Sequence, residues 1–305
     1  MTRSLILALL LSSAAAKAAA PGMAPDQASA RPLAKGKLMA GLLVDLKTAD
    51  NWTLKAKHLP AKDQRKTFIL LHGTGGRKED WYYLARALAG WGYGYLALDF
   101  RGHGESRIAP DGQALSWHKF KVTKAENEFA NMSRDVDAAF AYLVAQGVAE
   151  EQIGVIGADV GSSLGLKFSA VHPKIPLTIL LSPGLHYQEV LTVNAMRAYR
   201  GRPILMIYSE ADKYSSRETP LLYGFAKLST GEPNVTLLTV PQEHGVKMLR
   251  RQRDLIPKII DWIGNPVKAV GVAGSTMSVS GSSAPAADFS PEEPADESQA
   301  PGGVQ

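Results

Sequence analysis

The chain of 305 residues contains no cysteine. This absence excludes disulfide bonds, thiolate catalysis and the lipid-modified cysteine that anchors exported lipoproteins. Several histidines, among them His58, His118, His172 and His186, share no metal-ligand spacing with one another or with acidic residues, so we expect no metal site. No G-x-G-x-x-G turn follows a strand and no phosphate-binding lysine loop is present, so we expect no cofactor.

The sequence also lacks a strong charge bias, with a formal net charge of +5. Basic residues are mixed with acidic ones, as in the stretch KAENE, and no basic run contains interleaved aromatic residues. Composition therefore gives no indication of a nucleic-acid partner, and it leaves the oligomeric state open. The apolar fraction of 45% is typical of a globular protein with a substantial core.

The N-terminal residues have the pattern of an export signal. Arg3 gives a basic start, an apolar run follows from Leu5 to Ala16, and small residues with Ala-x-Ala spacing lie near position 20. A membrane anchor is the alternative, but the run is shorter than the roughly 20 apolar residues that a spanning helix needs. We predict a signal peptide over 1–20, a periplasmic or secreted protein, and no membrane span after the signal is removed.

Two further segments have too few large apolar residues to form a core. Residues 21–36 are rich in Pro, Ala and Gly, which is typical of a linker. Residues 267–305 are rich in Gly, Ser and Pro, and from Gly271 onward they contain five acidic residues and no basic one. Such a composition predicts a disordered tail. The folded domain is therefore expected over 37–266.

Short apolar runs alternate with amphipathic stretches inside this domain. Residues 38–46 and 52–59 form a predicted hairpin. Apolar strands that alternate with helices are typical of a parallel sheet covered on both faces. The sequence thus predicts an α/β fold with a mostly parallel, eight-stranded sheet. The other strands are expected at 67–73, 93–100, 153–158, 176–184, 203–209 and 235–241, and helices at 79–89, 125–146, after 160, and near 190–199, 218–227 and 255–263.

Polar residues follow four of the predicted strands, where sheets of this kind place their sites. The first strand end carries a glycine-rich turn, whose backbone N–H groups can face a developing oxyanion because Gly73 and Gly75 have no side chains. Asp159, Asp212 and His244 follow three later strands. We therefore expect these four loops to meet in one site.

From about Leu38 to Trp262 the chain resembles the α/β-hydrolase superfamily. The stretches LLHGTGG and LDFRGHGES, an elbow at Asp159, a late acid and a final histidine occur in the family's order. The resemblance implies that Asp159 takes the nucleophile position, Asp212 the acid position and His244 the base position. Only about twenty residues, 183–202, lie where many members insert a cap, so the chain is most similar to capless enzymes such as dienelactone hydrolases and small esterases.

The resemblance also implies an oxyanion hole, formed by the backbone N–H groups of Thr74 and Val160. The elbow is a sharp turn that needs small residues two positions on either side of the nucleophile, and Gly157 and Gly161 occupy those positions. Aspartate tolerates positive φ better than most residues, so Asp159 suits the backbone of this turn.

An aspartate in place of serine changes the chemistry that is expected. A carboxylate is already charged at neutral pH and needs no activation. Attack on an ester would give an unstable mixed anhydride, whereas attack on a saturated carbon that carries a halide or an epoxide oxygen gives an ordinary alkyl ester. His244 would then activate water against this ester, with Asp212 orienting the imidazole. We therefore expect a hydrolase that acts on a small organic substrate.

The charges of Asp159, Asp212 and His244 indicate the order of these two steps. Two carboxylates favour the charged form of the histidine between them, and an imidazolium is no base. Once Asp159 becomes a neutral ester, one of those charges is lost. His244 is therefore expected to act as a base only in the second step.

Haloalkane dehalogenases and epoxide hydrolases of the superfamily also have aspartate at the elbow. Both groups commonly have tryptophan directly after it, where this chain has Val160, and both have a cap that stabilises the leaving group. The sequence assigns no residue to that task. Residues 107–123 are a candidate flap, with Trp117, His118 and Phe120 near the mouth of the site. The alternative function is a degenerate, non-catalytic binding protein in which Asp159 and His244 form an inert ion pair.

Other polar residues have structural interpretations. Ser162 and Ser163 lie inside the helix after the elbow and are expected at its start or on its surface rather than as displaced nucleophiles. Glu210 is the alternative to Asp212 as the acid that orients the imidazole of His244. His72 is expected to pack beneath the glycine turn. Arg101 or His103 is expected to hold their loop by binding backbone carbonyls rather than substrate.

Overall fold

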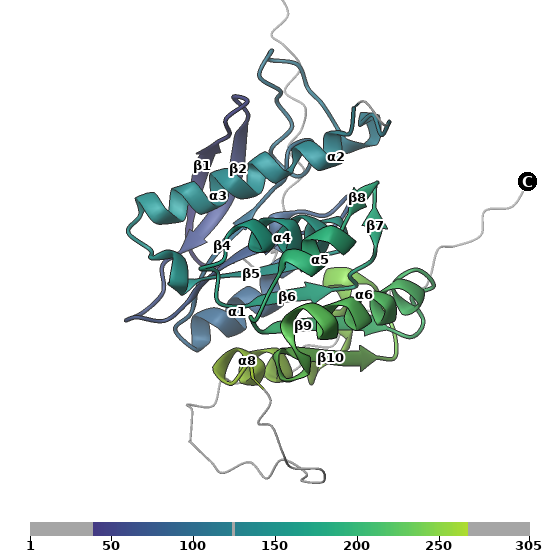
Figure 1. The fold of residues 1–305 in the computed structure, drawn as a ribbon. Helices are drawn as coiled ribbons and strands as arrows, with labels where there is room; N and C mark the ends of the chain where they lie inside the picture. The colour runs from purple at the N-terminus through teal and green to yellow at the C-terminus, as the bar shows by residue number, and fades with distance from the viewer. Residues whose placement is uncertain (1–38, 124–125, 268–305) are drawn as a thin grey trace, which may run out of the picture.

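An eight-stranded sheet organises the part of the chain that the computed structural model describes, residues 39–123 and 126–267 (Figure 1). The strand order is β1-β2-β4-β3-β5-β6-β9-β10. The first two strands form an antiparallel hairpin, and β2 pairs with β4 in antiparallel orientation. All pairs from β4 to β10 are parallel. The strands are β1 Leu42–Lys47, β2 Thr53–Leu59, β3 Thr67–Leu71, β4 Gly94–Leu98, β5 Ile153–Ala158, β6 Thr178–Leu181, β9 Ile204–Ser209 and β10 Val235–Val240.

Helices cover both faces of this sheet because the central strands are apolar on both sides. Phe68 and Leu70 of β3 pack in one core with residues of α1 and α8, whereas Ile69 and Leu71 pack in a second core with residues of α3 and α4. A third core joins α4, α5 and α6. The helices are α1 Tyr82–Gly90, α2 Glu128–Asn131, α3 Ser133–Ala145, α4 Val160–Val171, α5 Val193–Ala198, α6 Ser215–Thr230, α7 Met248–Arg251 and α8 Leu255–Gly264, and short 3-10 helices lie at Lys78–Trp81, Trp117–Lys119, Glu150–Gln152, Glu232–Asn234 and Gly245–Lys247.

The predicted fold class is confirmed, including the hairpin, the eight strands and the lack of a large cap among the described residues. The predicted helix 125–146 is interrupted at Met132, which separates α2 from α3. Asn127 caps α2 by accepting the backbone N–H groups of Phe129 and Ala130. Periodicity did not indicate the break, since both short helices bury their apolar residues on the same side.

The predicted helix near 190–199 is wrong at its N-terminal end. Its first residues belong to a two-stranded ribbon, in which β7 His186–Tyr187 pairs with β8 Val190–Leu191. Gln188 and Glu189, which connect the two strands, have φ values of 49° and 59°. Two successive residues with positive φ form the tight turn that matches the twist of a hairpin. The helix itself, α5, begins at Val193.

No helix in the described part of the chain is long and apolar enough to span a membrane. The predicted signal peptide 1–20 and linker 21–36 lie outside the described residues, as does the predicted tail 267–305 apart from Val267.

The turn between β5 and α4 positions the elbow. Asp159 has φ 52° and ψ −123°, a backbone conformation that residues other than glycine rarely adopt. A Cβ on Gly157 would lie 2.3 Å from the carbonyl oxygen of Gly161, and a Cβ on Gly161 would lie 2.3 Å from that of Leu71. Backbone atoms close in on both glycines, so neither position has room for a side chain.

We expect Gly161→Ala to lower the free energy of unfolding by about 3 kcal/mol, because the new methyl group meets backbone atoms of β3 that cannot move aside. The matched control is Gly224→Ala. Gly224 lies inside α6, and a Cβ added there would have no atom within 4 Å, so alanine should raise stability by about 0.5–1 kcal/mol. Urea unfolding of the two variants measures both effects, and equal stability would contradict the steric analysis.

Candidate active site

The register of the sheet brings the predicted site residues together. Leu71 of β3 pairs with Gly157 of β5, so the glycine turn two residues beyond Leu71 lies beside Asp159. Asp212 follows β9, and His244 follows β10, which lies next to it in the sheet. All four loops thus leave the sheet at its carboxyl edge, as the sequence predicted.

Asp159, His244 and Asp212 form a connected row. Nδ1 of His244 lies 2.5 Å from Oδ2 of Asp212, and Nε2 lies 3.7 Å from Oδ2 of Asp159. The side chains of Asp159 and Asp212 are largely buried, whereas that of His244 is 40% exposed. The imidazole therefore lies between two carboxylates, and Glu210, the competing acid, is exposed and has no hydrogen bond to it within the described structure.

Asp212 is held at the start of α6. The hydroxyl of Ser215 donates to Oδ2 at 2.5 Å, and the backbone N–H of Tyr214 donates to Oδ1 at 3.1 Å. Burial raises the pKa of Asp212, but the hydrogen bonds from Ser215 and His244 outweigh that effect and lower it. Asp212 is therefore charged at neutral pH and fixes the orientation of the His244 ring.

The two oxygens of the Asp159 carboxylate have different surroundings. Oδ2 accepts the backbone N–H of Thr74 at 3.0 Å and is the oxygen that faces His244. Oδ1 is buried and has no hydrogen-bond partner in the described structure. A buried oxygen of this kind costs free energy and requires an explanation. The carboxylate thus has one anchored oxygen and one that receives no hydrogen bond from the described residues.

The glycine turn is shaped for this contact. A Cβ on Gly73 would lie 2.8 Å from Cβ of Asp159, so only glycine allows the turn to come this close. Nδ1 of His72 lies 2.7 Å from the carbonyl oxygen of Gly73, and Nε2 accepts the N–H of Phe100. Burial lowers the pKa of His72 to about 4, so its ring is neutral and Nδ1 is the donor. His72 packs beneath the turn, where the sequence placed it.

Val160 begins α4 directly after Asp159. Among the described residues, the N–H of Thr74 is the only backbone N–H that donates a hydrogen bond to the Asp159 carboxylate, so the N–H of Val160 donates none to it. Its assignment as a second oxyanion donor stays a prediction.

The candidate flap lies against the glycine turn. A Cβ on Gly75, whose φ is 74°, would lie 2.9 Å from the ring of Trp117. His118 stacks on Trp117 with ring centroids 3.7 Å apart, and Phe120 lies against Gly102. Trp117 therefore lines one side of the site, next to Thr74.

Of the two residues considered for holding the loop after β4, His103 binds a backbone carbonyl and Arg101 does not. Nδ1 of His103 contacts the carbonyl oxygen of Arg101 at 2.9 Å, as expected. Arg101 itself binds carboxylates, because its buried guanidinium lies 2.6 Å from Asp50 and 2.6 Å from Asp135. A buried cation needs charged partners, which neutral carbonyls do not supply.

Ser162 and Ser163 are buried rather than on the surface. The Oγ of Ser162 donates to the carbonyl oxygen of Asp159 at 2.6 Å, which reinforces the first turn of α4. Neither serine has a hydrogen bond to His244 in the described structure, so neither is a displaced nucleophile.

Sequence reasoning missed two tyrosines that line the site. Tyr187 lies on β7 with its ring centroid 6.0 Å from that of His244, and Tyr214 lies 4.4 Å from Tyr187. Both hydroxyl groups are buried and have no hydrogen-bond partner in the described structure. Burial is the main cause that raises the pKa of both phenols, and nearby carboxylates add to it, so both keep their protons. The position of Tyr214, two residues after Asp212, was the only sequence signal.

A family model described as the alpha/beta hydrolase fold matches residues 66–199. This match supports the predicted resemblance to the α/β-hydrolase superfamily. Among solved structures, the chain is similar to an esterase from Pyrococcus furiosus, with 19% identity and a TM-score of 0.60 over 75% of this chain and 94% of the other. It is also similar to a dienelactone hydrolase from Anabaena variabilis, with 13% identity and a TM-score of 0.56 over 75% and 99%.

An esterase from Exiguobacterium antarcticum, with 13% identity, aligns at a TM-score of 0.52 over 74% of this chain and 100% of its own. No curated protein matches the sequence. The similar structures confirm the fold. Within residues 39–123 and 126–267, no three His, Asp or Glu side chains are placed to hold a metal ion.

His244 should titrate well above an ordinary histidine. Burial lowers its pKa, but the carboxylates of Asp159 and Asp212 outweigh burial and raise it from 6.5 to about 9. The interaction of protonated His244 with the two carboxylates stabilises the fold fully below pH 6.5. This stabilisation is lost as pH rises through about 9, because the imidazole then loses its proton. An NMR titration of the imidazole checks the value. Asp159→Asn should lower the pKa of His244, and an unchanged value would contradict the arrangement.

Proposed function

We propose that this protein is a hydrolase that opens epoxides by way of an ester on Asp159. The observation that carries the proposal is the buried Oδ1 of Asp159, which lacks any donor among the described residues, in a site that also contains two phenol hydroxyls without partners there. An unsolvated carboxylate oxygen is a strong nucleophile toward carbon. A phenol that keeps its proton is a suitable donor to a developing alkoxide.

In the first step, Oδ1 attacks a ring carbon of the epoxide. A bond forms between Oδ1 and carbon, the carbon–oxygen bond of the ring breaks, and its electron pair goes to the ring oxygen. The hydroxyl of Tyr187, with Tyr214 beside it, donates its proton to this oxygen. Asp159 becomes a neutral alkyl ester whose carbonyl oxygen, Oδ2, accepts the N–H of Thr74.

The loss of charge on Asp159 then prepares the second step. With one of its two carboxylates neutralised, His244 becomes more acidic and returns a proton to the phenolate of Tyr187, whose ring lies 6.0 Å away. The neutral imidazole, oriented by Asp212, takes a proton from water as the water attacks the ester carbonyl. The negative charge develops on Oδ2, beside the N–H of Thr74. Collapse releases a diol and restores the carboxylate and the imidazolium.

A haloalkane is the other substrate class that an aspartate nucleophile favours. A halide leaves without a proton, so it would not require the proton of Tyr187. The buried, partnerless hydroxyls therefore favour an oxygen leaving group. The esterases and the dienelactone hydrolase above support hydrolysis as the reaction class.

The site would act outside the cytoplasm, since we also propose that the protein is exported. The support is the basic start at Arg3 and the apolar run from Leu5 to Ala16.

The variant His244→Gln should trap the ester, because water can no longer be activated. After exposure to an aryl epoxide, its intact mass should rise by the mass of one epoxide, and peptide mapping should place the adduct on Asp159. The matched control, Asp159→Asn with His244→Gln, should show no increase in mass. No adduct in a variant shown to be folded by circular dichroism would favour the alternative of a non-catalytic binding protein.

Replacing Tyr187 by phenylalanine in the His244→Gln background should slow alkylation by an epoxide about 100-fold, because the leaving oxygen loses its proton donor. Alkylation by a bromoalkane of similar size should change little, since bromide needs no proton. Single-turnover mass spectrometry measures both rates. Equal slowing with both reagents would show that Tyr187 only shapes the site, and Tyr214→Phe tests the second hydroxyl in the same way.

A further inference from the structure

The face formed by α5 and α6 exposes apolar side chains away from the proposed active site. Leu221 and Leu228 of α6 are 56% and 88% exposed. With Phe225 between them, they lie at spacings of four and three residues and form one stripe along the helix. The opposite side of α6 is buried through Leu222 and Ala226. Leu221 and Leu228 are therefore open to solvent, and Phe225 between them is partly buried against the third core.

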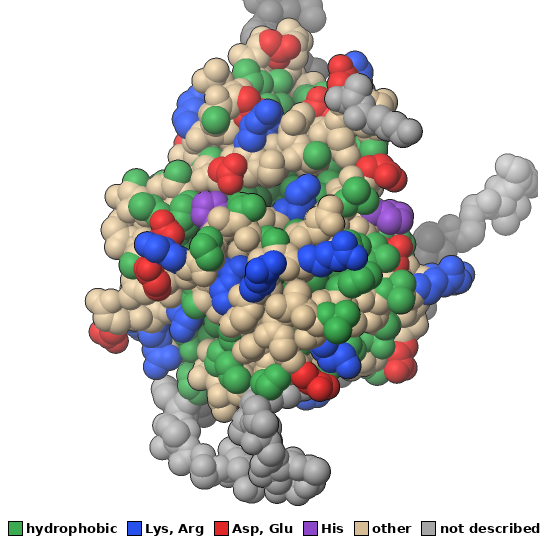
Figure 2. Space-filling model, in the orientation of Figure 1, with side chains coloured by type: hydrophobic (Ala, Val, Ile, Leu, Met, Phe, Trp, Pro, Cys, Tyr) green, Lys and Arg blue, Asp and Glu red, His purple; other side chains and the backbone are tan. Residues whose placement is uncertain are grey.

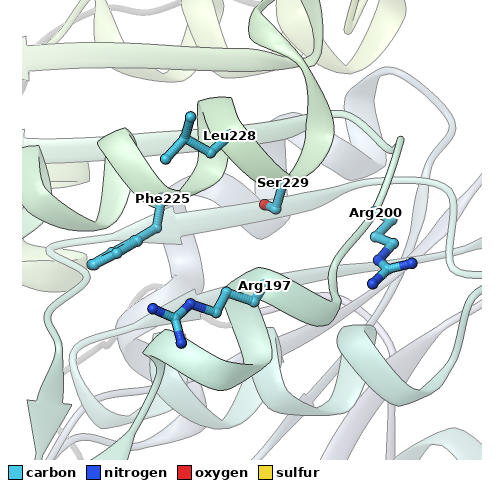
Figure 3. A pocket seen from close by; sticks show the side chains of 5 residues that line it. All are labelled: Arg197, Arg200, Phe225, Leu228 and Ser229. Carbon is cyan, nitrogen blue, oxygen red and sulfur yellow. The ribbon is translucent and has the colours of Figure 1, made fainter.

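A hollow of about 430 Å³ lies at this stripe, between α5 and α6. Figure 3 shows Phe225, Leu228 and Ser229 of α6 on one side of it, with Arg197 and Arg200 on the other. The Arg197 guanidinium lies 5.5 Å from the ring centroid of Phe225. Neither arginine forms an ion pair within the described residues, and Figure 2 shows several Lys and Arg side chains on this side of the molecule. The hollow thus suits a ligand that is both aromatic and acidic.

The C-terminal part of the same chain has this chemistry. Residues 268–305 contain a single aromatic residue, Phe289, which directly follows Asp288 and precedes Glu292 and Glu293. Beyond Lys268 they contain no basic residue. We propose that the segment 288–297 binds in the hollow, with Phe289 against Phe225 and its acidic residues beside the two arginines.

The covalent chain is long enough for this contact within one molecule. Twenty-one residues lie between Val267, the last described residue, and Phe289. At about 3.3–3.6 Å per residue, this stretch spans up to roughly 75 Å. A domain of this size has a radius of gyration of roughly 17 Å. Every point of its surface is therefore within reach, and the tether raises the local concentration of the segment enough to support a weak contact.

The lack of cysteine allows a direct test in the full-length protein. A nitroxide on Ser290→Cys should weaken the NMR signals of backbone amides in α5 and α6 and leave those of α1 and α8 unchanged. Arg197→Glu combined with Arg200→Glu should abolish the effect, as should Phe289→Ala, because each removes one half of the complementarity. The control pair Arg250→Glu and Arg253→Glu, which reverses two exposed charges elsewhere, should preserve it.

A mixed sample separates contact within one molecule from contact between two. Nitroxide-labelled protein without ¹⁵N is added to ¹⁵N-labelled protein without nitroxide, and the proposal expects no loss of signal. Loss of α5 and α6 signals in this sample would overturn docking within one molecule and indicate a second copy as the occupant. Uniform or absent signal loss in the singly labelled protein would overturn the proposal altogether.

Discussion

The site depends on how closely the first turn of α4 approaches the end of β3. Gly161 allows this approach, because the carbonyl oxygens of Leu71 and His72 occupy the space where a side chain would begin. The same approach places Thr74 at hydrogen-bond distance from Asp159. The proposed nucleophile and the proposed oxyanion donor are thus positioned by backbone packing, which is stiffer than contacts between long side chains.

The charges in the site follow from this rigid frame. Asp212 is anchored at the start of α6 and cannot follow His244 if the ring moves. The imidazole is therefore held between the anchored carboxylate of Asp212 and the carboxylate of Asp159, the proposed nucleophile. In the proposed cycle, the charge of Asp159 alone changes, and the basicity of His244 changes with it. Chemistry at one carboxylate sets the timing of the next proton transfer without any movement of the backbone.

Much of the fold could be predicted because the central strands are apolar on both faces and the loops after them carry the polar residues. The order of Asp159, Asp212 and His244 along the chain was also visible in the sequence. Tyr187 was not, because its ribbon turns at Gln188 and Glu189, and neither residue is a usual signal for positive φ. The carboxylate partners of Arg101 were hidden for another reason: Asp50 and Asp135 are distant in sequence and meet only in the folded chain.

The ribbon β7–β8 has a consequence for how such an enzyme diversifies. It is a short segment between β6 and α5, and its two strands pair only with each other and not with the eight-stranded sheet. The length or sequence of the ribbon can therefore change in evolution without altering the positions of the elbow, the glycine turn and His244. Because Tyr187 lies on this ribbon, the proposed proton donor to the leaving group can change in evolution independently of the proposed nucleophile, Asp159.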